Sequence, residues 1–195
     1  MTQIVDQYGR QVRTTMLDKE VAAPCLTGLR SLWNYGDVTN GLTPIGLARV
    51  LRSAAEGDHE AYLTLAEEME ERDPHYASVL GTRKRAVSGL PVVVEAASDD
   101  PGDVKLADAV RLLFKRRGIR ALLQDLMDSV GKGYSVVEIM WDRKASPWTP
   151  AGYEWRDPRF FQFDQATRRE VRLRDEGDML NGLPLEPYKF LVHNP

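Results

Sequence analysis

Apolar residues recur at helical spacing in the first half of the chain and at alternating positions in the second half. Two successive segments carry apolar residues at i, i+3, i+4 and i+7, which is the pattern of an amphipathic helix, and a third carries them on one helical stripe. Helix-starting signals precede them at Thr43-Pro44, Asp58 and Asp73-Pro74, because Thr and Asp cap a first turn and proline fits the first helical position. The pattern predicts three helices, whose apolar stripes are Leu47, Val50, Leu51 and Ala54; Tyr62, Leu65, Ala66 and Met69; and Tyr76, Val79, Leu80 and Val87.

The middle of the chain predicts a strand–helix–helix–strand unit. Residues 91–97 are rich in β-branched side chains, which favours a strand. Asp100-Pro101 opens one helix and Gly118 separates it from a second. Alternation over residues 134–141 then predicts the closing strand.

Three short alternating segments separated by turn residues follow at 159–163, 170–174 and 189–193. They predict the antiparallel strands of a meander. Helices and strands are thus segregated along the chain, and this indicates the α+β class. The predicted architecture has N-terminal helices, the strand–helix–helix–strand unit and a C-terminal antiparallel meander.

Trp141, Trp148 and Trp155 recur every seven residues, a spacing that resembles a coiled-coil seam. Pro147 and Pro150 lie among them, and proline breaks a helix interior. These tryptophans are therefore predicted to pack against a sheet or against a neighbouring subunit.

The N-terminal region lacks a clear periodicity. Residues 1–25 are predicted to form an extended arm that needs a neighbour to become ordered. Residues 26–36 are predicted as a short helix with Leu26, Leu29 and Trp33 on one side. The expected organisation is an arm with a short helix over residues 1–40 and an α+β domain over residues 41–195.

Charge and composition narrow the function classes. The 195 residues carry a net charge of −3, whereas proteins that grip nucleic acid usually have a basic excess. The single cysteine, Cys25, excludes an intramolecular disulfide and suits a reducing compartment. No apolar run has the length of a membrane-spanning helix, and the first residues lack a signal-peptide pattern.

No arrangement of residues typical of an active site stands out. His59, His75 and His193 are isolated in the sequence, and no spacing typical of a metal site occurs. Gly131-Lys132-Gly133 precedes a strand rather than a helix, so it is predicted to be a turn and not a phosphate-binding loop. The sequence therefore predicts a non-enzymatic protein without metal or cofactor.

Glu138 is the most unusual side chain, because alternation places it on the same strand face as Tyr134, Val136 and Met140. A carboxylate in an apolar row must be paired, hydrogen-bonded or at an exposed edge. Structural pairing, with an arginine of the same or a neighbouring subunit, is the favoured interpretation. An acid–base role with a histidine in one pocket is the alternative.

Charged clusters of opposite sign predict a subunit interface. Arg83, Lys84 and Arg85 lie on the third helix, with Arg83 in its apolar stripe, and the preceding helix has an acidic face with Glu67, Glu68 and Glu71. Such clusters fix the register of an interface more than they add affinity. A second basic cluster over residues 115–120 suits a helix C-terminus. Contact of either cluster with nucleic acid is the less favoured alternative.

Five stretches resemble, in the same order, the portal proteins of Mu-like phages and prophages. They are residues 41–58, 67–98, 131–141, 155–164 and 182–193, and residues 4–12 resemble the start of the family. Several dispersed motifs in order are more specific than any one of them. The resemblance covers most of the chain.

This resemblance implies a structural subunit of a ring, typically of twelve subunits, at one capsid vertex. DNA passes through such a ring during packaging and ejection, while ATP hydrolysis belongs to the terminase. The implied partners are further copies of the chain, the terminase, and the capsid and head–tail connector proteins. The implied location is the virion, and the host cytoplasm during assembly.

The family pattern is longer than this chain, since portal subunits also have channel-facing helices, a clip and a crown. The chain is therefore expected to correspond to the N-terminal, wing-like portion of a subunit, with little direct contact with DNA. Two alternatives stay open at this point. One is a stand-alone interaction module from a degraded prophage, and the other is a hydrolase that uses Glu138 with a histidine.

Overall fold

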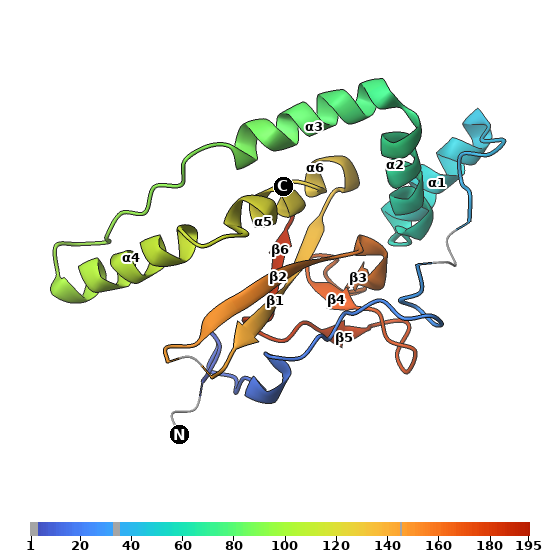
Figure 1. Cartoon of the computed structure of the whole chain (residues 1–195). Helices are drawn as coiled ribbons and strands as arrows, with labels where there is room; N and C mark the ends of the chain where they lie inside the picture. Colours follow the sequence, from blue (N-terminus) through green and yellow to red (C-terminus); the bar gives the residue numbers. More distant parts are fainter. Residues whose placement is uncertain (1–3, 33–35, 145) are drawn as a thin grey trace.

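Helices occupy the first half of the chain and two small antiparallel sheets the second (Figure 1), which confirms the predicted α+β class. The computed structural model describes residues 4–32, 36–144 and 146–195. The helices are α1 (Pro44–Glu56), α2 (Glu60–Arg72), α3 (Pro74–Ser88), α4 (Pro101–Phe114), α5 (Ile119–Leu126) and α6 (Ser129–Lys132). The strands are β1 (Ser135–Asp142), β2 (Thr149–Arg156), β3 (Phe161–Phe163), β4 (Val171–Leu173), β5 (Leu183–Pro184) and β6 (Phe190–His193).

Local capping explains where the long helices begin. The Thr43 hydroxyl accepts a hydrogen bond from the Gly46 amide, and the Asp73 and Asp100 carboxylates accept from amides of the first turns of α3 and α4. These contacts satisfy amides that have no partner within the helix. Helix α2 differs from the prediction, because His59 and not Asp58 occupies its capping position, without a side-chain cap.

Two three-stranded sheets share the second half of the chain. The first sheet has the order β2-β1-β6 and the second the order β3-β4-β5, and all pairs are antiparallel. Of the three strands predicted for the meander, β3 and β4 pair with each other, whereas β6 pairs with β1, and the unpredicted β5 completes the second sheet. Strand β1 thus lies at the centre of the first sheet, which explains the burial of its first five residues.

Strand β2 was not predicted from the sequence. It tolerates Pro150, since β2 is an edge strand and only one of its sides needs ladder hydrogen bonds. Of the three tryptophans predicted to pack against a sheet or a neighbouring subunit, Trp141 lies on β1 and Trp155 on β2, whereas Trp148 precedes β2 and has the Arg143 guanidinium 5.3 Å from its ring centroid. The Lys132 ammonium also lies 5.0 Å from the centroid of the Trp155 ring, in a cation–π contact.

The predicted strand over residues 91–97 is wrong. No described strand pairs with this segment, which crosses from α3 to α4 as an extended connection (Figure 1). Val93 in this segment is 76% exposed. The β-branched side chains of the segment therefore do not pack on a sheet. The segment is held to α4 by the Arg111 guanidinium, which donates to the Val94 carbonyl at 2.7 and 2.9 Å.

The N-terminal region also differs from its prediction. Residues 26–32 form turns and not a helix, with Gly28 at a φ of +86°, while positions 33–35 lie outside the described residues. The arm does not depend on a neighbour, because Val12, Leu17 and Ala22 are buried against the body of their own chain. The proposed division into residues 1–40 and 41–195 stays a prediction.

Alternation along β1 divides the interior into two apolar cores. Val136 belongs to a core that includes Phe161 of β3 and Leu63 of α2. Its neighbour Val137 points to the opposite face and packs against Leu122 of α5. The central strand therefore joins the helices to both sheets.

The turn between β3 and β4 predicts a measurable acid sensitivity. Hydrogen bonds from the Thr167 amide and hydroxyl, and from the Glu170 amide, hold the pKa of Asp164 well below its ordinary value of 3.8. A depressed carboxyl pKa stabilises the fold above the unfolded-state pKa, and this contribution is lost as the pH falls toward the folded-state pKa. We expect Asp164→Asn to lose stability at neutral pH and to show a weaker fall in stability between about pH 5 and about pH 2.

Urea unfolding across this pH range measures the effect. The exposed Asp99 provides the matched control, and Asp99→Asn should follow the wild-type pH profile. An unchanged pH profile for Asp164→Asn would show that the hydrogen-bonded turn does not set the acid sensitivity.

Candidate assembly surface

Helices α3 and α4 form a hairpin whose far end, made of the extended connection and α4, projects from the body of the molecule (Figure 1). In helix α4, Ala107 is the buried residue among those described, and most of the helix faces solvent. Large apolar side chains are exposed along the hairpin: Val79, Val87, Leu90, Val92, Val93, Val104, Leu106, Leu112 and Phe114. Extended apolar exposure of this kind is typical of a surface that another macromolecule covers.

A half-buried charge network holds α3 on the body. The Lys84 ammonium lies 3.0 Å from Glu70 Oε1 of α2 and 2.9 Å from Asp128 Oδ1, and Asp128 Oδ2 lies 3.0 Å from the Lys132 ammonium. Burial alone would lower the pKa of Lys84, but Asp128 and Glu70 outweigh it and raise this pKa. Burial likewise favours a higher pKa for Asp128, but Lys132 and Lys84 hold it below its usual value.

This network corrects the predicted role of the first basic cluster. Arg83 was placed in the apolar stripe, which suggested a buried or interfacial partner, but Lys84 is the residue of the cluster that faces the acidic helix and is 8% exposed. Arg83 and Arg85 are exposed and make no ion pair with the described residues. The apolar stripe predicted for α3 is also rotated, because Val79 and Val87 are exposed whereas Leu80, Lys84 and Ser88 are buried.

Most of the acidic residues predicted for the interface on α2 form contacts within their own chain. Glu67 lies 2.6 Å from the Arg159 guanidinium, and burial raises the pKa of this carboxyl despite Lys132 and Arg159. Glu68 accepts hydrogen bonds from the amides of Val38 and Thr39. Glu71 is exposed and remains on the surface.

Glu138 is fully buried and is paired within its own chain. Its carboxylate accepts from Arg156 Nε at 2.8 Å and lies 3.2 Å from the Lys189 ammonium. It also accepts from the backbone amides of Val21 and Ala22, at 2.6 and 3.1 Å. The predicted pairing with an arginine is thus confirmed, and the side chain is not on a surface that a neighbour could contact.

The Glu138 network joins the N-terminal segment to the first sheet. The Lys189 ammonium donates to the carbonyls of Leu17 and Ile139, at 3.0 and 2.9 Å. Burial lowers the pKa of Lys189, against the opposing effect of Glu138. No local pattern could have predicted this lysine, because it lies far from Glu138 along the chain.

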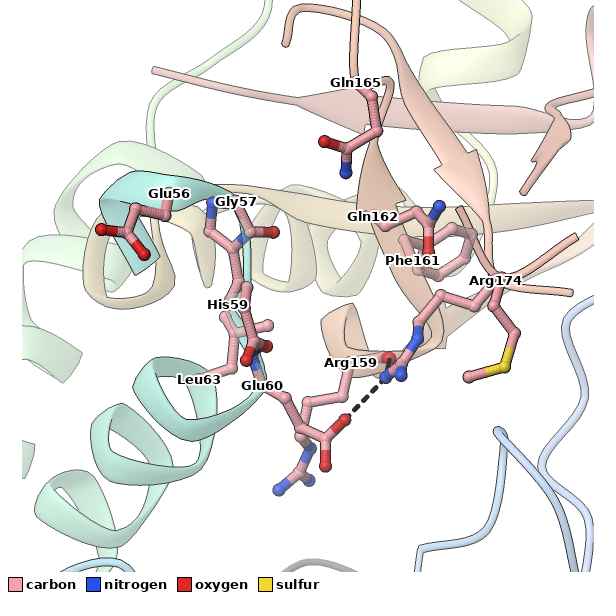
Figure 2. A pocket seen from close by; sticks show the side chains of 12 residues that line it. Glu56, Gly57, His59, Glu60, Leu63, Arg159, Phe161, Gln162, Gln165 and Arg174 are labelled. Atoms are coloured by element: carbon pink, nitrogen blue, oxygen red, sulfur yellow. Dashed lines mark hydrogen bonds and ion pairs between the residues drawn. The ribbon is translucent and has the colours of Figure 1, made fainter. Parts of the chain in front are cut away.

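A polar hollow of about 270 Å³ lies between the α1–α2 turn and the second sheet (Figure 2). Figure 2 shows Glu60 and Arg174 joined across it, at 2.8 Å. The His59 ring lies 2.9 Å from the Gly57 carbonyl and packs on Phe163. Glu60, Arg174 and His59, which line the hollow, are thus engaged with each other or with neighbouring groups of the chain.

The proposed pairing of Glu138 with a histidine in one pocket finds no support. Among the described residues, the partners of Glu138 are two backbone amides, an arginine and a lysine. His59 lines the hollow of Figure 2, and Glu138 does not. Within the described ranges, no three His, Cys, Asp or Glu side chains are grouped so as to hold a metal ion, and no helix has the length and apolarity to cross a membrane.

The sequence matches a known family over most of its length. The family described as "Portal protein of Mu bacteriophage" matches residues 63–195, which include α3 to α6 and both sheets. The chain therefore belongs to the family of Mu-type portal proteins, as the resemblance of its motifs predicted.

Two curated relatives agree with this assignment. One is the portal protein of Escherichia phage Mu, 34% identical over 158 residues, which are 80% of this chain and 30% of the relative. The other is the Mu-like prophage FluMu protein gp29 of Haemophilus influenzae, 31% identical over 150 residues, or 73% and 28% of the two chains. The matched region thus spans under a third of the length of either relative.

Proposed function

We propose that this chain is part of a non-enzymatic phage portal subunit that assembles into a ring through which DNA enters and leaves the capsid. The family match over residues 63–195 carries this proposal. The projecting α3–α4 hairpin supports it, because a ring subunit needs surface that is covered by neighbours.

The chain is proposed to form the wing-like, peripheral part of the subunit, made of the segment 1–40 and the domain 41–195. A net charge of −3 suits a part that does not grip DNA. The proposed partners are further copies in a ring, typically a dodecamer in the family, together with the terminase and the capsid and head–tail connector proteins. The proposed location is the virion, after assembly in the host cytoplasm.

The predicted interface residues contribute unequally to this proposal. Arg83, Arg85 and Glu71 are exposed and available to a neighbouring subunit. Lys84, Glu67 and Glu68 are engaged within the chain and would act by holding α2 and α3 in place.

A chimera tests the proposed function directly. The matching segment of the phage Mu portal protein is replaced by this chain, and the chimera is supplied to a phage Mu that lacks its own portal protein. We expect DNA-filled heads and plaques. A folded chimera that yields only empty heads would contradict the portal role and favour a stand-alone interaction module.

A further inference from the structure

A groove with an apolar floor and a basic rim lies where α3, the extended connection and α5 meet. Its volume is about 490 Å³, and no carboxylate is among its described lining residues. Leu90, Val92 and Phe114 line it and are exposed. Its rim carries Lys115, Arg116, Arg117 and Arg120, and we call it the basic groove.

The rim cations have no ion-pair partner among the residues that the structure describes. All four are exposed, and none makes an ion pair with a described residue. By contrast, Arg111 at the same groove is engaged by Asp108 and by the Val94 carbonyl. Four unpaired like charges within six residues repel one another, and an acidic partner relieves this repulsion.

The loop between β4 and β5 has the complementary character. Residues 175–180, here called the acidic loop, contain Asp175, Glu176 and Asp178. Met179 and Leu180 follow, and each is 66% exposed. An apolar pair that follows three carboxylates matches an apolar floor beside four cations.

The acidic loop is already shaped for binding. Asp178 accepts from the Asn181 amide at 2.9 Å, and the Leu180 carbonyl accepts from the Gln162 side chain at 2.9 Å. Gly182 closes the loop at a φ of +64°, where a Cβ would lie 2.6 Å from the Leu173 carbonyl oxygen. A preorganised loop loses little conformational entropy when it binds.

The two surfaces lie far apart in one molecule. The groove is lined by residues of the α4–α5 junction, and in Figure 1 this junction lies on the other side of the sheets from the segment between β4 and β5 that contains the acidic loop. A groove and a loop on different sides form a heterologous contact, which closes into a ring when the rotation between copies permits.

We propose that the basic groove of one copy binds the acidic loop of the next copy. This inference rests on the proposed ring function and adds the contact that joins neighbours. Met179 and Leu180 fill the apolar floor, while the loop carboxylates face the arginine rim. Duplex DNA fits the groove less well, because a phosphate backbone leaves the floor of Leu90, Val92 and Phe114 uncovered.

Disulfide trapping between two separately labelled copies tests the contact. In a Cys25→Ser background, one copy carries Leu90→Cys and the other Met179→Cys, and the rate of heterodimer formation is measured at low salt. Arg116→Glu with Arg117→Glu in the first copy should slow trapping at least about tenfold, because it places like charges opposite each other. Glu176→Arg in the second copy should then recover most of the rate.

The control reverses Arg49 and Arg52, two exposed cations of α1, and should leave the rate unchanged. Trapping that is insensitive to the groove reversal would overturn the proposal. Salt-dependent binding of duplex DNA through Arg116 and Arg117, with no trapping between copies, would also overturn it and assign the groove to DNA. If the phage chimera is functional but trapping fails, only the proposed contact is refuted. If trapping succeeds but the chimera is not functional, only the portal role is refuted.

Discussion

We expect Glu138→Ala to lower the free energy of unfolding by about 3–5 kcal/mol, the largest effect of any substitution proposed for this chain. The change leaves Arg156 and Lys189, 5% and 0% exposed, without the carboxylate that pairs with both. It also leaves the amides of Val21 and Ala22 without an acceptor. Each unsatisfied buried group adds its own desolvation cost.

Urea unfolding measures this loss, and two variants define its origin. Glu154→Ala removes an exposed carboxylate from the paired position of the adjacent strand, and it should change stability by less than about 0.5 kcal/mol. Glu138→Gln keeps the shape and an acceptor but removes the charge, so its loss should lie between the two. A Glu138→Ala protein as stable as Glu154→Ala would refute the role of the buried network.

The same substitution should loosen the N-terminal segment before the sheets unfold. Amide hydrogen exchange at Val21 and Ala22 reports this directly, because both amides bond to Glu138. Exchange at these amides should accelerate more than exchange at Val137 in the centre of β1. Equal acceleration would show that the network supports the whole fold and not this junction.

Asp128→Ala is expected to cost about 2–3 kcal/mol, because it removes the carboxylate shared by Lys84 and Lys132. The expected loss is smaller than that for Glu138→Ala, because the Asp128 side chain is 14% exposed. Solvent therefore partly screens the charges of Lys84 and Lys132 that the substitution leaves behind. The loss should also free α3 to move, and with it the wall of the basic groove. Urea unfolding and hydrogen exchange in α3 measure both effects.

Asp125 supplies the control for this position. Burial raises the pKa of the Asp125 carboxyl, and the negative charges of Asp128 and Glu154 raise it further. Its charged form is therefore disfavoured by its surroundings, and Asp125→Ala should cost little or nothing. A larger loss for Asp125→Ala than for Asp128→Ala would contradict the proposed anchoring of α3.

The elements that the sequence predicted well carry strong local signals. Thr43-Pro44, Asp73-Pro74 and Asp100-Pro101 start helices as predicted, because capping and proline geometry act within a few residues. Alternation over 134–141 likewise predicted β1. Local physics is enough where a feature depends only on neighbouring residues.

The elements that the sequence missed depend on distant partners. Strand β2 was missed, because it forms by pairing with β1, and its edge position makes Pro150 acceptable. Residues 91–97 have strand-forming side chains, yet the fold offers them no strand to pair with. β-Propensity measures the fit to a neighbouring surface, so it fails where that surface is absent.

The candidate site follows the same division. The pairing of Glu138 was predictable, because a buried carboxylate requires a partner. Its second cation, Lys189, comes from a segment 51 residues away and could not be predicted without the fold. Lys84 replaced Arg83 at the acidic helix because the orientation of α3 depends on Asp128, which lies beyond two further helices.

The mass of the chimeric portal protein in solution tests the central claim most directly. Light scattering gives the mass in solution of two proteins: the phage Mu portal protein that carries this chain, and the 195-residue chain alone. We expect a closed ring of many subunits for the chimera and a far smaller species for the chain alone. A chimera that folds but stays monomeric, at concentrations where the phage Mu protein forms rings, would contradict the claim that this chain works as part of a portal subunit.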